Sequence, residues 1–251
     1  VALRSFLNEL QKRICIRGMR AARRAKKVWV VTDADYRMVH DIWGIECDHL
    51  LEAGTDESLK GVVHEYRKGD ALKIVWSGIH TSRKALPILL HALRSIKVDC
   101  KNVTIKVEVL GDGPETAKWR RLAKRLSVDD MLTWRGRVPR ADALDIMRQS
   151  HVLACPSIKE ASSIVVIEAV SLGLPVICHD ACGMGVVITD NCGIKVPLKD
   201  PETSIRGFEE ALKMLLNEPE NVARLSHGAL ERAKELTWAA KARIIANAYE
   251  R

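Results

Sequence analysis

Two kinds of segment alternate along most of this 251-residue chain, and this alternation limits the folds that are open to it. Runs of β-branched and other apolar residues predict buried strands at residues 28–32, 73–77, 103–110, 131–135, 151–155, 174–178 and 194–196. The segments between them carry apolar residues at helical spacing, for example Leu86, Leu89, Leu90 and Leu93. Strands that alternate with helices in this way are parallel and are joined by crossover helices, which predicts a Rossmann-like α/β layer.

The strands are unevenly distributed, and this predicts the domain organisation. Residues 73 to about 200 hold six strand candidates, enough for one doubly wound parallel sheet. Residues 1–53 supply one long helix, a strand, a short helix and another strand, which are too few elements to bury both faces of a sheet. We therefore expect residues 1–70 to be the end of a second Rossmann-like domain, 71–236 to be the main domain and 237–251 to be a C-terminal helix.

The net charge of +8 is confined to one segment. Residues 1–30 carry nine Lys or Arg and one acid, Glu9, and the remaining residues are neutral in sum. Aromatic residues make up only 4% of the chain, so it has few platforms on which bases could stack. These features argue against nucleic acid as a partner.

The basic N-terminal segment has two open interpretations. One side of the predicted helix carries apolar residues, namely Leu3, Phe6, Leu7, Leu10 and Ile14. The segment is either a plain surface helix or an amphipathic helix through which residues 1–27 dock on an anionic membrane surface, each basic residue adding about 1 kcal/mol. A membrane span is not expected, because the longest uncharged stretches have about ten residues, against roughly 20 for a span. No signal peptide is evident.

The seven cysteines are scattered and include no C-x-x-C pair, which favours free thiols in a reducing cytoplasm. Cys178, His179, Cys182 and Cys192 could be combined into a zinc site, but their spacing matches no common structural-zinc pattern. We therefore expect no metal site. We expect a cytoplasmic protein, which would be peripheral on the inner face of the membrane if the basic helix docks on lipid.

Candidate chemistry lies after three of the predicted strands, because ligands of open α/β sheets bind beyond the carboxyl ends of the strands. Residues 78–84 join a glycine turn to Arg83 and Lys84, and residues 111–114 form a second glycine-rich turn. Residues 156–163 lead into residues 164–172, which we expect to be a buried helix. Two serines at its start would cap it, and Gly173 would end it.

Two glutamates flank the start of this helix. Glu160 precedes it and Glu168 lies in its second turn. Eight residues of helix rise about 12 Å, so the two carboxylates cannot bind one atom, but they could contact two ends of an extended ligand. A phosphate would then lie between them at the helix N-terminus. This geometry suits a nucleotide-sugar, which has hydroxyls at both ends and a pyrophosphate in the middle.

Several blocks of the sequence resemble one enzyme family. Glu160-(x)7-Glu168, with Pro156-Ser157 before it and Gly173-Leu174-Pro175-Val176 after it, resembles the E-x7-E signature of the family 4 retaining glycosyltransferases, which have the two-Rossmann GT-B fold. VWVVTDAD and LEAGTD resemble the close of that family's N-terminal domain. IVWSGIHTSRKALPILLHAL, VLGDGPE and WRGRVPRADALDIMRQSHVLACPSIKE resemble its C-terminal donor-binding domain, and LTWAAKARIIANAYE resembles its last helix, which returns to the N-terminal domain.

This resemblance, which runs from about residue 25 to the end, implies retaining transfer of a hexose from a nucleotide-diphosphate sugar to a hydroxyl acceptor on a glycan or lipid. It also implies that no cofactor or metal ion is needed. Glu160 would be the catalytic residue that holds the hexose, Glu168 would bind the ribose hydroxyls and Lys84 the pyrophosphate. The other implied donor-binding residues are Gly78, His80, Arg83, Gly111, Arg137, Val138, Ser162, Ser163 and Ile164. Backbone N–H groups of residues 162–164 would face the distal phosphate or the sugar, and main-chain groups around residues 137–138 would border the base. Residues 1–70 would be the remnant of the acceptor-side domain.

Two positions depart from the family pattern. The family has an arginine directly after the glycine that corresponds to Gly78, where this chain has Ile79, and His80 or Arg83 are the candidates to replace that charge. The family's glycine pair followed by an acid corresponds to residues 182–186, which end on Val186. The alternative hypothesis is therefore a non-catalytic nucleotide-sugar-binding or membrane-docking module with the same fold. Glu168 and Lys84 would then be ordinary helix residues. For residues 111–114, a simple turn is favoured over a phosphate cradle.

Overall fold

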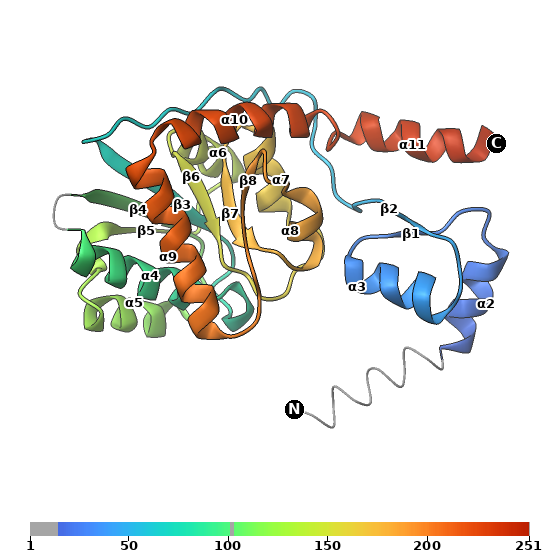
Figure 1. Cartoon of the computed structure of the whole chain (residues 1–251), viewed down its shortest axis with the longest axis horizontal. Helices are drawn as coiled ribbons and strands as arrows, with labels where there is room; N and C mark the ends of the chain where they lie inside the picture. The colour runs from blue at the N-terminus through green and yellow to red at the C-terminus, as the bar shows by residue number, and fades with distance from the viewer. Residues whose placement is uncertain (1–14, 101–102, 251) are drawn as a thin grey trace.

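A six-stranded parallel sheet forms the centre of the computed structural model, which describes residues 15–100 and 103–250 (Figure 1). Its strands are β3 (Ala71–Ser77), β4 (Thr104–Leu110), β5 (Leu132–Gly136), β6 (Val152–Cys155), β7 (Val176–His179) and β8 (Gly193–Val196). Their spatial order is β5-β4-β3-β6-β7-β8, so the chain winds outward in one direction from β3 and in the other direction from β6. This is the doubly wound Rossmann-like order, and the predicted fold class is confirmed.

Helices cover both faces of the sheet, because successive side chains of a strand point to opposite faces. Leu72, Ile74 and Trp76 of β3 pack into one half of the core, and Val75 packs into the other. The helices of the first half are α4 (Leu86–Asp99), α5 (Thr116–Arg125) and α9 (Pro201–Asn217). Those of the second half are α6 (Arg140–Arg148), α7 (Ile164–Ser171) and α8 (Cys182–Val187). α10 (Glu220–Ala233) contacts both α7 and α9 and thereby joins the two layers.

α7 has the predicted helical structure but not the predicted cap. Ser163 occupies the N-cap position with a φ of 55°, and its side chain makes no capping hydrogen bond. The expectation of serine capping is therefore wrong, because the left-handed backbone at Ser163 leaves its hydroxyl buried without a partner. The helix ends as predicted, at Gly173, whose φ is 75°.

The N-terminal part of the described chain is small and thinly packed. It contains α2 (Ile16–Arg24), β1 (Trp29–Val30), α3 (Asp33–Tyr36), a π-helical continuation η1 (Arg37–Ile42) and β2 (Asp48–His49). β1 is shorter than the predicted strand at residues 28–32, and it pairs in parallel with β2 alone. Val30, Val39 and Cys47 form the small buried cluster of this part. The apolar side predicted for residues 3–14 lies outside the described residues.

The segment after β2 and the last helix, α11 (Trp238–Glu250), connect the two parts of the molecule (Figure 1). The N–H of Thr55 donates to the carbonyl of Leu236 over 3.1 Å, and the N–H of Trp238 donates to the carbonyl of Thr55 over 3.1 Å. Near the far end of α11, Lys26 Nζ donates to the carbonyl of Tyr249 over 3.0 Å. α11 therefore begins on the large domain and ends on the N-terminal part. Among the described helices, none is both long and apolar enough to cross a bilayer.

Candidate active site

The loops that follow β3 and β6 meet at the centre of the sheet, because these two strands are neighbours and point in the same direction. This is the position at which the strand order reverses, where open α/β sheets form a crevice for ligands. The N–H of Ile158 donates to the carbonyl of Arg83 over 2.9 Å, and Arg83 Nη1 donates to the carbonyl of Lys159 over 3.1 Å. The two loops that carry most of the predicted site are thus bound directly to each other.

Lys84 lies in the short 3-10 turn η2 (Ser82–Lys84), and its side chain runs back over Gly78. A Cβ atom at position 78 would lie 3.2 Å from Lys84 Cε, so a larger residue would press on the lysine stem. The Lys84 side chain is only 11% exposed, and its Nζ lies 2.5 Å from Glu160 Oε1. The structure therefore brings Lys84, the residue predicted to bind the pyrophosphate, into contact with Glu160, the predicted catalytic residue.

Glu160 lies between two cations. Its Oε2 accepts a hydrogen bond from Arg83 Nη1 over 3.2 Å, while its Oε1 makes the contact with Lys84. The Lys84 contact has the distance of an ion pair without the alignment of a hydrogen bond. With a side chain that is 8% exposed, Glu160 is largely withdrawn from water. Two positive groups beside one carboxylate leave the cluster with a net positive charge, which suits an anionic ligand.

The N-terminus of α7 has a partner that the sequence did not reveal. Glu52, from the segment after β2, accepts a hydrogen bond from the N–H of Ser162 over 3.1 Å through Oε1, and its Oε2 accepts one from the Ser162 hydroxyl. Partial burial acts to raise the pKa of Glu52, but the hydrogen bonds from Ser162 and from the Glu52 backbone, together with the Lys241 charge, lower the pKa overall. The only sequence signal was an acid close behind a strand, directly before the turn at residues 53–56.

Glu168 belongs to a separate ion pair. Its Oε1 accepts a hydrogen bond from Arg140 Nε over 2.6 Å, and its side chain is 11% exposed, whereas that of Arg140 is 64% exposed. Arg140 was not among the predicted residues, although it opens α6 two residues after the predicted pair at 137–138. Arg137 is exposed, and Val138 packs partly against the core beneath α6 and α7.

His80 does not supply a charge to the site. It is 1% exposed, its ring packs edge-on or tilted against Trp76, Trp119 and Trp134, and its Nδ1 lies 2.9 Å from Thr116 Oγ1. Burial lowers the pKa of the imidazole, which favours the neutral form. The expectation that His80 could replace the arginine missing at Ile79 is therefore corrected, since Arg83, and not His80, reaches Glu160 beside Lys84.

Gly111 contributes through its backbone. Its φ is 111°, and a Cβ atom there would lie 1.9 Å from the carbonyl oxygen of Gly78. The N–H of Gly78 donates to the carbonyl of Leu110 over 3.1 Å. The turn at residues 111–114 thus supports the Gly78 loop from behind, which agrees with the favoured interpretation as a turn.

The loop after β7 also departs from the family pattern in a way that the structure clarifies. Cys182 stands at the first glycine position with a φ of 55°, and the N–H of Gly183 donates to the carbonyl of Ala161 over 2.8 Å. Val186 packs against the core and offers no acid to the site. In the described part of the chain no cluster of three potential metal ligands occurs, and His179 bonds to Ser157 and Ser204 instead.

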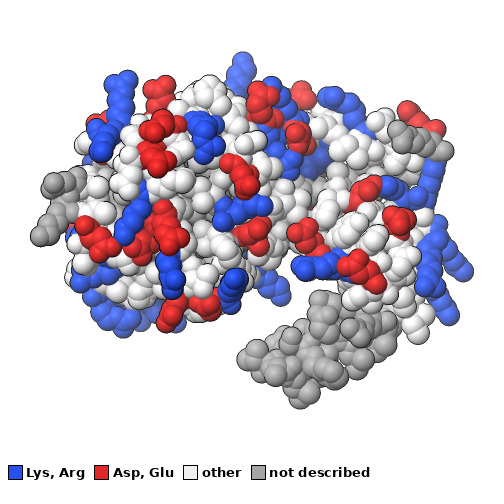
Figure 2. Space-filling model, viewed as in Figure 1, with Lys and Arg blue, Asp and Glu red and all other residues white. Residues whose placement is uncertain are grey.

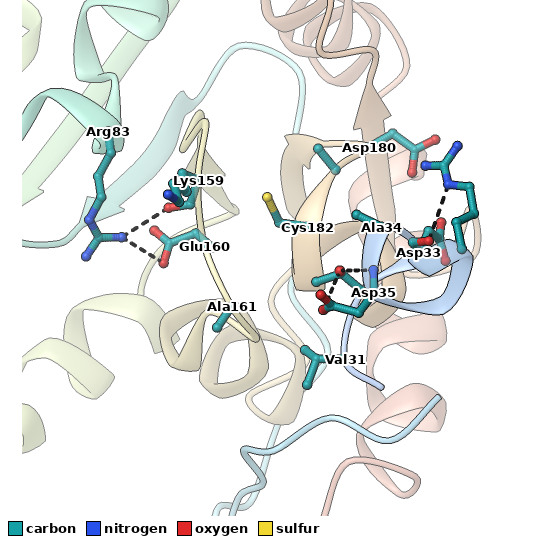
Figure 3. A pocket seen from close by; sticks show the side chains of 14 residues that line it. Val31, Asp33, Ala34, Asp35, Arg83, Lys159, Glu160, Ala161, Asp180 and Cys182 are labelled. Carbon is teal, nitrogen blue, oxygen red and sulfur yellow. Dashed lines mark hydrogen bonds and ion pairs between the residues drawn. The ribbon is translucent and has the colours of Figure 1, made fainter. Parts of the chain in front are cut away.

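Two cavities adjoin the loop that carries Glu160 and share Glu160 and Ala161. The first has a volume of about 590 Å³ and is lined by Glu52, Ala53, Ser77, Gly78, Lys84, Glu160, Ala161, Ser162, Ser163, Ile164, Val165 and Trp238. The second has a volume of about 810 Å³ and lies between this loop and the N-terminal part (Figure 3). Its lining includes Asp33 and Arg37 of the N-terminal part and Arg83, Glu160 and Asp180 of the large domain. Glu160 therefore lies where a ligand in each cavity could reach it.

A cationic cluster beside a helix N-terminus, at the switch point of a doubly wound sheet, is the arrangement of nucleotide-binding α/β enzymes. Residues 65–232, about two thirds of the chain, match the protein family described as "Glycosyl transferases group 1". The chain belongs to this glycosyltransferase family, and the predicted GT-B glycosyltransferase class is confirmed.

Curated relatives share moderate identity with the chain. It is 33% identical over 188 residues to the D-inositol 3-phosphate glycosyltransferase of Streptomyces bingchenggensis, a match that covers 72% of this chain and 40% of the relative. It is 26% identical over 171 residues to the enzyme of the same name from Corynebacterium efficiens, with 66% and 39% covered. The chain thus spans about 40% of the length of these relatives.

Solved structures show the same fold at low sequence identity. Sucrose-phosphate synthase from Thermosynechococcus elongatus has a TM-score of 0.71 and 21% identity to this chain. The match covers 93% of this chain and 60% of the synthase chain. Anabaena HepE in complex with UDP and glucose has a TM-score of 0.68 and 16% identity to this chain. The match covers 90% of this chain and 64% of the HepE chain.

Proposed function

We propose that this chain is the donor-binding part of a family 4 retaining glycosyltransferase. It would move a hexose from a nucleotide-diphosphate sugar to a hydroxyl acceptor in glycan, polysaccharide or glycolipid assembly. The observation that carries this proposal is the contact of Glu160 with both Arg83 and Lys84 at the switch point, beside the N-terminus of α7. UDP is present in the related HepE structure, which makes it the first nucleotide to test.

The residues of the cluster suit distinct roles in the reaction. The departing diphosphate carries the largest charge that develops during transfer, and the Arg83 and Lys84 cations would stabilise it without a metal ion or cofactor. Glu160 would accept hydrogen bonds from the hexose hydroxyls, because its carboxylate lies within reach of the cations that hold the phosphate. Glu168, held by Arg140, would accept hydrogen bonds from the ribose hydroxyls.

We also propose that residues 1–70 belong to the acceptor-side domain, residues 71–236 form the donor domain and residues 237–251 return to the acceptor side. The larger cavity supports this division, because residues 31–37 form the wall that faces Glu160 (Figure 3). A hydroxyl acceptor in this cavity would approach the sugar beside Glu160. Acceptor specificity would then depend on the N-terminal part.

Three measurements test the proposal. The 251-residue chain should bind a nucleoside diphosphate weakly and transfer nothing, because closure of a two-domain cleft excludes water and completes the site. A thermal-shift panel of UDP-, GDP- and ADP-sugars would identify the donor. In the complete transferase, diphosphate release and a product of unchanged anomeric configuration, read by NMR, are expected. Nucleotide-sugar binding without diphosphate release would favour the non-catalytic module. Turnover by this chain alone would show that our assignment of the active site is wrong.

A second candidate property is docking on an anionic membrane surface. The four arginines of α2 are all exposed, and none of them forms an ion pair with another described residue: Arg17, Arg20, Arg23 and Arg24. Figure 2 shows basic side chains gathered along the edge formed by α2. Such a segment gains binding energy near anionic lipid. We propose a cytoplasmic location with peripheral attachment to the membrane, which agrees with seven free cysteines.

A further inference from the structure

Glu52, which lies outside the proposed donor domain, reaches the N-terminus of α7. It is separated by 110 residues from Ser162, yet its carboxylate accepts hydrogen bonds from both the N–H and the hydroxyl of that serine. Glu52 also lines the smaller cavity together with Lys84 and Glu160. The Glu52 carboxylate therefore occupies the two Ser162 donors to which the phosphate of the proposed donor would bind.

The surroundings of Ser162 suit an anion with more oxygens than one carboxylate offers. The adjoining Ser163 is 8% exposed, and its hydroxyl is buried without a hydrogen-bond partner while the residue lines the same cavity. Lys84 lines this cavity as well. A phosphate presents several oxygens and more charge, so it can engage Ser162, Ser163 and Lys84 together.

Glu52 is held in place by the helix that connects the two parts of the molecule. Lys241 of α11 is 5% exposed, and its Nζ donates to the carbonyl of Leu51, next to Glu52, over 2.9 Å. The ammonium of Lys241 also exerts an attractive charge on the Glu52 carboxylate. Glu52 itself is exposed, so water can solvate its carboxylate when it leaves Ser162.

We propose that Glu52 is an internal competitor for the donor's distal phosphate: it occupies the N–H and hydroxyl of Ser162 and is displaced when a nucleoside diphosphate binds. This inference rests on the proposed function, because it takes the smaller cavity as the donor site. It assigns to Glu52 a role in tuning donor affinity. Glu52 is thus a positioning residue that weakens ground-state donor binding, and it is not a catalytic residue.

The test compares nucleotide affinities of matched variants of this chain by calorimetry. Glu52→Gln keeps the size of the side chain and one acceptor but removes the charge, and Glu52→Ala removes both. Glu57→Gln removes an exposed acid from the same segment and serves as the control. We expect both Glu52 variants to bind UDP about five- to tenfold more tightly than the parent, since a charge-assisted contact no longer has to be broken. Glu57→Gln should bind like the parent.

A second ligand makes the result specific. UMP has no distal phosphate, so its affinity should be the same in the parent and in Glu52→Gln. Unchanged or weaker UDP binding in the Glu52 variants would overturn the inference, because Glu52 would then be a simple cap or a donor contact. An equal gain for UMP would also overturn it, since the competition would not concern the distal phosphate.

The outcome for the parent chain is separate from the outcome for the variants. Binding of UDP, GDP or ADP by the parent decides whether this is a nucleotide site, and the ratio between parent and Glu52→Gln decides the role of Glu52. If neither the parent nor any variant binds any of these diphosphates, the proposed function is wrong and the inference falls with it.

Discussion

The large domain and the N-terminal part differ sharply in how their elements are held. The six strands of the large domain are covered on both faces, and large side chains such as Trp76, Trp119 and Phe208 are fully buried. In the N-terminal part, β1 and β2 are two residues long, and its buried cluster consists of Val30, Val39 and Cys47. Within the described residues, α2 has no buried side chain.

This contrast indicates that the two parts owe their order to different causes. Burial of apolar area stabilises the large domain on its own, at roughly 25 cal/mol per Å². The N-terminal part buries too little, and it depends on contacts with α11, such as that of Lys26 with Tyr249. The proposed active site lies at the boundary, because Glu160 is fixed by the stable domain and lines a cavity together with residues 31–37 of the other part.

The largest expected effect tests the two cores directly. Leu89→Ala, in the fully buried centre of α4, should lower the free energy of unfolding by about 2–5 kcal/mol through lost burial and a cavity. Val39→Ala should change the same global transition by less than about 1 kcal/mol, because a weakly held part opens locally before the domain unfolds. Urea titration measures both. An equal loss of unfolding free energy in Leu89→Ala and Val39→Ala would show that the two parts unfold as one unit.

The boundary itself is tested by Glu160→Gln in the complete transferase. Transfer should fall on the order of a hundredfold or more, because a sugar contact that strengthens in the transition state appears in turnover. Nucleoside diphosphate binding should be unchanged or somewhat tighter, since Arg83 and Lys84 lose a competing carboxylate. Turnover and calorimetry are read side by side. Full activity in Glu160→Gln would end its catalytic assignment.

Lys84→Ala tests the donor site within the large domain alone. Removal of a charge-assisted contact worth about 1.5–3 kcal/mol should weaken nucleoside diphosphate binding by about ten- to 150-fold. Lys118→Ala on α5 is the control, because that side chain is 73% exposed and lines neither of the two cavities. Parent-like affinity in Lys84→Ala would place the phosphate elsewhere.

Acidification should affect the two parts in opposite directions. Burial lowers the pKa of His151 in the large domain to about 4, below the ordinary 6.5, so only the unfolded state takes up a proton between these values. Stability of the large domain is therefore lost as the pH falls from about 6.5 to about 4. The hydrogen bond to Asp41 raises the pKa of His40 in the N-terminal part. The stability that protonated His40 contributes to this part is therefore present at low pH, and it is lost as the pH rises through the pKa of His40.

Hydrogen exchange at about pH 7.5 and pH 5 measures this difference segment by segment. His151→Asn keeps an acceptor for the N–H of Lys73, which donates to His151 Nδ1 over 3.0 Å, and it should flatten the pH dependence of the large domain. An unchanged pH dependence in this variant would assign the effect to other groups.

The smallest expected effect concerns α2. Binding to anionic vesicles should decline steeply with salt, because the Debye length shrinks from about 30 Å at 0.01 M to about 8 Å at 0.15 M. Replacing Arg17, Arg20 and Arg24 by Gln should abolish this binding without changing nucleotide affinity. Equal binding to neutral vesicles, or no binding to either kind, would leave α2 as a plain surface helix.

Much of the fold was predictable because strands and helices follow local patterns. The six strands of the sheet lie within a few residues of their predicted positions, and the helix at Ile164–Ser171 was correctly distinguished from a strand by its flanking residues. The errors concern single side chains. His80 follows a strand and a glycine turn, as a ligand residue would, but the three surrounding tryptophans come from β3, α5 and β5 and bury it.

The sequence by itself determined the strand–helix alternation and the placement of Gly78, Lys84, Glu160 and Glu168 after strand ends or on one helix, because hydrophobic periodicity and helical rise are local properties. Only the tertiary structure decided which charges meet: Glu160 with Arg83 and Lys84, Glu168 with Arg140, and Glu52 with Ser162. These pairs depend on which loops converge at the switch point of the sheet. That convergence follows from the spatial order of the strands and from the return of residues 50–56 along α11, and neither leaves a repeating pattern in the chain.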